Sequence, residues 1–137
     1  MARVTTSKIM QHSSFIPFNQ SMLPGGILLT DILRTMDFLS PEIVILHGSS
    51  VSKMRFSPLG NMDLDIICAS RKAPFWSLEN LYERYYELMD NENVNVDLTI
   101  LSHSGLLAVL KDTKTSLNDS INNGFTILHK MEDFNEF

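Results

Sequence analysis

Two segments of the sequence alternate between apolar and polar residues, and this alternation constrains the fold more than any other feature. Residues 62–68 carry Asp63 and Asp65 between apolar neighbours, and residues 94–101 repeat the pattern around Asp97. Side chains of a β-strand point alternately to the two faces of a sheet. Both segments are therefore predicted strands that present acidic side chains on one face.

The rest of the chain supplies further strands and the helices that would cover the sheet. Residues 42–47 form a short, nearly continuous apolar run, which is typical of a strand buried on both faces. Apolar residues spaced three and four apart predict a helix over residues 28–39, ended by Ser40 and Pro41. The remaining predicted elements are helices over residues 77–89, 105–111 and 116–123 and an edge strand over residues 125–129. This order predicts an α/β (α+β) fold, a small β-sheet with helices mainly on one face.

The length of 137 residues fits one domain, and no repeat or linker divides the chain. We expect residues 23–137 to form this domain and residues 1–22 to be an N-terminal arm, to which the pattern assigns at most a short strand. The single Cys68 lies in an apolar strand pattern and is expected to be a buried small hydrophobe. No apolar run approaches the roughly 20 residues of a membrane span, and the N-terminus lacks the apolar core of a signal peptide. A cytoplasmic location is therefore expected.

The net charge and the positions of the basic residues indicate which class of partner the chain can bind. A formal net charge of −5 argues against an extended nucleic-acid partner, because neutralising phosphates takes an excess of Lys and Arg. Basic residues nevertheless bracket the two neighbouring aspartates, namely Lys53, Arg55, Arg71 and Lys72. A local positive collar of this kind suits a compact polyanion.

The paired aspartates raise an electrostatic problem that a metal ion would solve. On one strand face, the Cα atoms of Asp63 and Asp65 would lie roughly 6–7 Å apart, so the two carboxylates would repel each other. Mg²⁺ binds one or two protein carboxylates and completes its shell with water and phosphate oxygens. Asp97, at the same polar register of another strand, offers a third carboxylate. Three carboxylates on neighbouring strands could hold two Mg²⁺ ions.

A turn rich in small residues follows the strand predicted over residues 42–47. Gly48 allows a close approach of the backbone to a ligand, and the hydroxyls and backbone N–H groups of Ser49 and Ser50 can bind phosphate. Lys53 and Arg55 fit a triphosphate contact and a solvated loop equally well. Together with the Asp-x-Asp strand, this turn is suited to a metal-bound nucleoside triphosphate.

These motifs resemble the signature of the DNA polymerase β-like nucleotidyltransferase superfamily, and its small standalone members, the minimal nucleotidyltransferases, are the most similar type. The resemblance covers about residues 25–130. The matching pieces are Ile45-Leu46-His47-Gly48-Ser49, then Met62-Asp63-Leu64-Asp65-Ile66, then Val96-Asp97-Leu98.

The resemblance implies a mixed sheet and the Mg²⁺-dependent transfer of a nucleoside monophosphate, AMP in the first instance, from an NTP to a protein or small-molecule acceptor. It implies that Asp63 and Asp65 bind Mg²⁺, that Asp97 shares a metal and helps to deprotonate the acceptor, and that Gly48 and Ser49 hold the triphosphate. So small a domain would recognise its acceptor through a partner chain or a homodimer. One partner that the resemblance implies is a HEPN-type ribonuclease toxin, which would make this chain an antitoxin-type regulator.

Other interpretations of the same residues remain open at the level of sequence. The acids could mark a solvated strand face, and the domain could be a noncatalytic module that has kept the nucleotidyltransferase fold. The four histidines have no metal-ligand spacing among them, which argues against a zinc site. The histidines, including His47, are therefore given no role in the predicted site.

Overall fold

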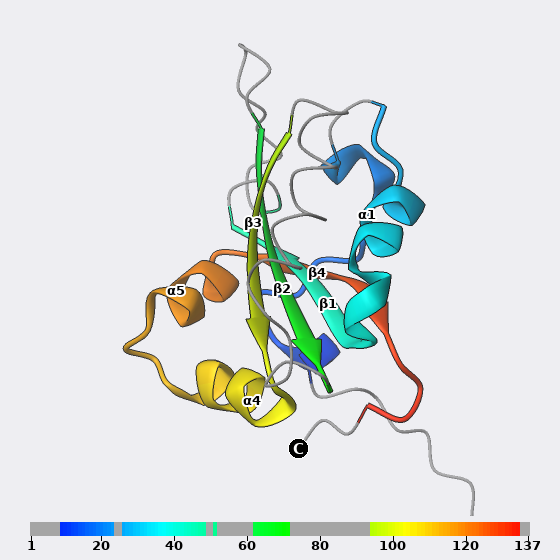
Figure 1. The fold of residues 1–137 in the computed structure, drawn as a ribbon. Coiled ribbons are helices and arrows are strands. Elements are labelled where there is room, and N and C mark those ends of the chain that lie inside the picture. Colours follow the sequence, from blue (N-terminus) through cyan, green and yellow to red (C-terminus); the bar gives the residue numbers. More distant parts are fainter. Residues whose placement is uncertain (1–8, 24–25, 49–50, 52–61, 72–93, 135–137) are drawn as a thin grey trace, which may run out of the picture.

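A computed structural model describes residues 9–23, 26–48, 51, 62–71 and 94–134; for residues 62–63 and 94–95 it describes the backbone alone. Its centre is a four-stranded sheet in the order β3-β2-β1-β4 (Figure 1). The strands are β1 (Pro41–His47), β2 (Met62–Ser70), β3 (Val94–Leu101) and β4 (Phe125–Lys130). β2 and β3 pair in parallel, whereas β1 pairs antiparallel with both β2 and β4. The prediction of a small mixed sheet is confirmed.

The described α-helices lie close to the predicted ranges, and the helix His103–Lys111 begins two residues before its predicted start. They are α1 (Leu29–Met36), continued by the 3-10 turn η3 (Asp37–Leu39), then α4 (His103–Lys111) and α5 (Ser116–Asn122). Ser102 and Thr115 cap α4 and α5, because their hydroxyls accept hydrogen bonds from backbone N–H groups of the first turn. Gly124, with φ of 139°, ends the turn that leads from α5 into β4. The helix predicted over residues 77–89 lies outside the described residues.

Helices cover both faces of the sheet (Figure 1). On one face, α1 and η3 pack on Val44, Leu46, Leu64, Ile66, Cys68 and Val96. On the other face, α4 and α5 pack on Ile43, Ile45, Ile67, Ala69 and Phe125. Among the described helices, α4 and α5 share one face, in agreement with the predicted helices mainly on one face, and α1 with η3 covers the other. The cause lies in β1, whose nearly continuous apolar run is buried on both faces and needs cover on each.

The described part of the N-terminal arm packs on the domain. Its two 3-10 turns are η1 (Ile9–Gln11) and η2 (Gln20–Met22). Ile9 of η1 packs in the core on the α4 and α5 side, and Met22 of η2 packs in the core on the α1 side. Between the turns, Phe15 forms an isolated parallel bridge with Phe125 of β4. Residues 9–22 therefore contact both cores and the β4 edge of the sheet.

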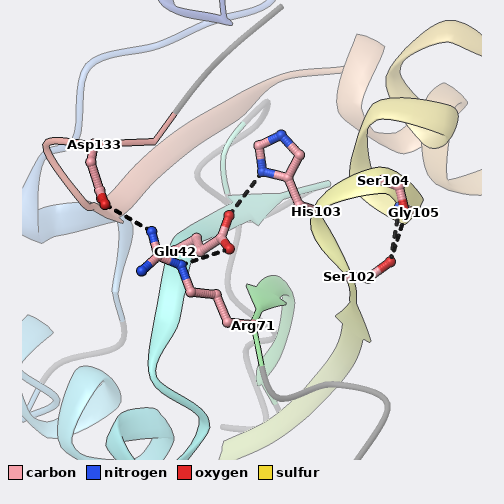
Figure 2. A network of polar contacts seen from close by, with 7 residues as sticks. All are labelled: Glu42, Arg71, Ser102, His103, Ser104, Gly105 and Asp133. Carbon is pink, nitrogen blue, oxygen red and sulfur yellow. Dashed lines mark hydrogen bonds and ion pairs between the residues drawn. The ribbon is translucent and has the colours of Figure 1, made fainter.

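A polar network at the start of β1 ties together four parts of the chain (Figure 2). The buried Glu42 side chain bonds Arg71, with Nε 3.0 Å from Oε1, and His103, with Nδ1 2.8 Å from Oε2. Arg71 also donates to Asp133 over 2.9 Å. Glu42 thus joins β1 to the end of β2, the start of α4 and the segment after β4.

The position of Arg71 corrects one element of the charge interpretation. Arg71 was placed in a positive collar around Asp63 and Asp65, yet it lies beyond the other end of β2, about 20 Å along the strand from Asp65. Its guanidinium is engaged by Glu42 and Asp133. The other three basic residues of that collar lie outside the described part of the chain.

The structure also bears on the expected burial of Cys68 and on the expected absence of a membrane span. Cys68 is fully buried in β2, and burial raises the pKa of its thiol to about 12, so it behaves as the expected buried hydrophobe. Within the described ranges, every helix is too short or too polar to cross a membrane.

Candidate functional site

Two of the predicted acidic residues lie side by side on neighbouring strands. Asp65 of β2 and Asp97 of β3 are direct partners in the parallel register, and neighbouring strands are about 4.8 Å apart. Both side chains are on the sheet face that carries α4 and α5, because Asp65 shares its strand parity with Ile67 of that core. The Asp65 side chain is half-buried and that of Asp97 is exposed. The fold therefore brings two carboxylates together at a solvent-accessible point.

The third predicted acid is described only through its backbone. Asp63 lies two residues before Asp65 in β2 and pairs with Asn95 of β3. Its side chain lies outside the described atoms. Over the described residues, His, Cys, Asp and Glu side chains form no group of three or more that could hold a metal ion. Asp65 and Asp97 by themselves still fit Mg²⁺, which binds one or two carboxylates together with water and phosphate oxygens.

Gly48, which directly follows β1, lies next to Asp65 of this carboxylate pair. Its φ of 85° lies in the left-handed region, and a Cβ atom built on it would be 2.7 Å from Asp65 Oδ2 and 3.4 Å from Ser120 Oγ. A side chain at this position would therefore collide with the carboxylate. The Val51 N–H donates to the Gly48 carbonyl over 3.1 Å, and the Val51 side chain is buried in the α1-side core. Gly48 is thus held beside Asp65, and Val51 is held in the core.

Four predicted phosphate contacts fall outside the described residues: Ser49, Ser50, Lys53 and Arg55. Gly48, which precedes Ser49 in the sequence, lies next to Asp65. The roles given to these four residues stay predictions.

The structure adds His47 and Ser120, to which the sequence analysis gave no role. His47 ends β1 and is the antiparallel register partner of Asp65, so it belongs to the same row as Asp65 and Asp97. Its ring is buried, and Nδ1 lies 2.7 Å from Ser120 Oγ of α5. Burial lowers the pKa of His47 to about 4, and the negative charge of Asp97 opposes this effect. The imidazole is therefore neutral at neutral pH.

One signal could have pointed to His47, whereas Ser120 gave none. His47 directly precedes Gly48 and shares the strand parity of Ile43 and Ile45, so the buried run of β1 already placed it on one face of the sheet. Ser120 reaches the site only through the packing of α5, a contact between residues 73 positions apart in the chain.

The free energy of unfolding is expected to fall on acidification because of His47. Unfolded, His47 takes up a proton near pH 6.5, whereas in the folded chain it does so near pH 4. Protons therefore favour the unfolded chain between these values, and the loss should amount to about 2 kcal/mol on going from about pH 7.5 to about pH 5. Urea unfolding of the wild type and His47→Gln at both pH values measures this loss, which the variant should lack. An equal loss in His47→Gln would contradict the assignment of the effect to His47.

Comparisons with known proteins add one structural likeness. No protein-family model matches the sequence, and no curated protein matches it. A solved structure described as "Crystal structure of the toxin-antitoxin with AMP-PNP" has a similar fold, with a TM-score of 0.52 and 17% sequence identity. The likeness covers 77% of this chain and 76% of that chain. At this identity it concerns the fold alone.

Proposed function

We propose that this chain is a Mg²⁺-dependent nucleotidyltransferase that transfers a nucleoside monophosphate, with AMP as the first candidate, from an NTP to a protein or small-molecule acceptor. The observation that carries the proposal is the pairing of Asp65 with Asp97 beside the glycine turn at Gly48. A structure of similar fold was determined with AMP-PNP, which supports nucleotide binding by such a domain. The motif resemblance supports the transfer chemistry.

The acidic residues would hold the metal. Asp65 and Asp97, with Asp63 from the same strand as Asp65, would bind Mg²⁺, and bound Mg²⁺ would supply positive charge beside the triphosphate and the leaving pyrophosphate. Gly48 has no side chain, which lets its backbone lie close to the Asp65 carboxylate beside the proposed metal site. Asp97, exposed at the rim, accepts the proton of the acceptor hydroxyl. The chain otherwise contributes positioning, since phosphoryl chemistry is driven mainly by geometry and electrostatics.

The acceptor would be presented by another protein. The structure of similar fold belongs to a toxin-antitoxin complex, which supports a protein partner for this chain. We propose that the acceptor is recognised through such a partner, with a HEPN-type ribonuclease toxin as the first candidate, or through a second copy of this chain. In the first case, the chain would act as an antitoxin-type regulator that modifies its partner.

Thermal unfolding with nucleotide tests the proposal. Wild-type protein is expected to gain about 2.7 kcal/mol of stability when Mg²⁺-ATP is present at about 100 times its Kd. Asp65→Asn should lose this gain, because it removes a charged ligand of the metal-bound triphosphate. Asp37→Asn, an exposed aspartate on η3, is the control and should keep the gain.

Two results would contradict the proposed enzymatic function. An absence of stabilisation by all four NTPs in the wild type would contradict nucleotide binding at this site. Stabilisation without release of pyrophosphate in the presence of partner protein would favour the noncatalytic module with the same fold.

A further inference from the structure

The contact between His47 and Ser120 places a hydroxyl group at the centre of the candidate site. Ser120 Oγ lies 2.7 Å from His47 Nδ1 and 3.4 Å from the point that a Cβ atom on Gly48 would occupy. Asp65 Oδ2 lies 2.7 Å from that same point. The serine hydroxyl therefore lies beside Gly48 and the Asp65 carboxylate, next to the proposed site of the metal-bound triphosphate.

Ser120 and His47 together provide the two groups of an activated nucleophile, a hydroxyl and a neighbouring base. A serine hydroxyl within hydrogen-bond distance of an imidazole nitrogen can pass its proton to that nitrogen as it attacks. The 2.7 Å contact between Ser120 Oγ and His47 Nδ1 provides the route for this transfer. Ser120 is half-buried, and it lies in the last turn of α5, whose packing on the sheet holds the hydroxyl in place.

We propose that Ser120 is a site of self-nucleotidylation, an inference that rests on the proposed nucleotidyltransferase function. Ser120 Oγ attacks the α-phosphorus of the bound NTP, and the new Oγ–P bond forms as the bond from this phosphorus to the bridging oxygen breaks. Pyrophosphate leaves with the electron pair of that bond, and the Oγ proton passes to His47 Nδ1. The product is a phosphodiester between Ser120 and the nucleoside.

The position of this product gives the modification a consequence. A nucleoside monophosphate on Ser120 would lie against Gly48 and Asp65, at the site proposed for the next NTP. Self-nucleotidylation would therefore switch off transfer to other acceptors in the modified molecules. A protein acceptor that reaches the site first would compete with Ser120 for the same nucleotide.

Mass spectrometry of the intact protein tests the inference. After incubation with Mg²⁺ and ATP, with GTP, CTP and UTP in parallel, the wild type is expected to gain the mass of one nucleoside monophosphate, and peptide fragmentation to place it on Ser120. Ser120→Ala should lower the modified fraction at least about tenfold, whereas Ser120→Thr, which keeps a hydroxyl, should retain it. Ser116→Ala, an exposed serine of the same helix, is the matched control and should be modified as the wild type is.

The outcomes separate this inference from the function on which it rests. Stabilisation by Mg²⁺-NTP that depends on Asp65, without an adduct on Ser120, would overturn self-nucleotidylation and leave the proposed function standing. An adduct that persists in Ser120→Ala would overturn it in the same way. An absence of both binding and adduct would overturn the two proposals together.

Discussion

Replacing Asp97 with Asn is expected to lower the rate of nucleotidyl transfer by about 10²–10⁴-fold and to leave much of the nucleotide affinity intact. Asn has nearly the shape of Asp, but its amide cannot accept the proton of the acceptor hydroxyl and carries no charge for a metal ion. Asp97 is exposed, so the substitution should change the free energy of unfolding by no more than about 0.5 kcal/mol. Pyrophosphate release measures the rate, and titration with Mg²⁺-AMP-PNP measures the affinity.

A second measurement on the same variant does not depend on turnover. The charge of Asp97 raises the pKa of His47, so its removal should move that pKa further below its usual value. Titration of the His47 ring by NMR reads this shift directly, with Asp37→Asn as the control that should leave it unchanged. If Asp97→Asn lost rate and affinity equally, the role of Asp97 as proton acceptor would be contradicted.

Much of the fold could be predicted because its signals are local. The alternation in residues 94–101 and the continuous apolar run before Gly48 each describe a strand through its own side chains. Short helices are likewise marked by their own caps, such as Ser102 at the start of α4. The face that each helix covers could not be predicted, because the apolar stripe of a helix shows that it packs on a sheet but not on which face.

The candidate site could be predicted only as far as strand periodicity reaches. Parity placed Asp65 and Asp97 on polar strand faces, and their direct pairing depends on the parallel register of β2 and β3, which no local pattern encodes. His47 and Ser120 meet because α5 packs on the sheet beside β1. For Arg71 the sequence was misleading. Arg71 is near Asp63 and Asp65 in the sequence, which suggested a shared site, but the length of β2 separates it from them in space.

Replacing Gly48 with Ala is expected to destabilise the fold and to abolish nucleotide binding. A left-handed backbone costs a residue with a Cβ atom about 1–2 kcal/mol, and the φ of Gly48 is 85°. The new Cβ atom would also lie 2.7 Å from Asp65 Oδ2, closer than real Cβ atoms approach other atoms. Either the turn or the Asp65 carboxylate must move, and both belong to the proposed site. The free energy of unfolding from urea titrations and the affinity for Mg²⁺-ATP should therefore fall together.

Gly105→Ala is a matched control for this substitution. Gly105 lies in α4, where Ala is favoured over Gly by about 1 kcal/mol, and its Cβ atom would meet Ser102 Oγ at 3.3 Å, a contact that a small shift relieves. This variant should keep both stability and nucleotide affinity. If Gly48→Ala bound Mg²⁺-ATP as well as Gly105→Ala does, the space beside Asp65 would not be the triphosphate site. The roles proposed for Asp65, Asp97 and Ser120 all depend on that site, so they would be contradicted together.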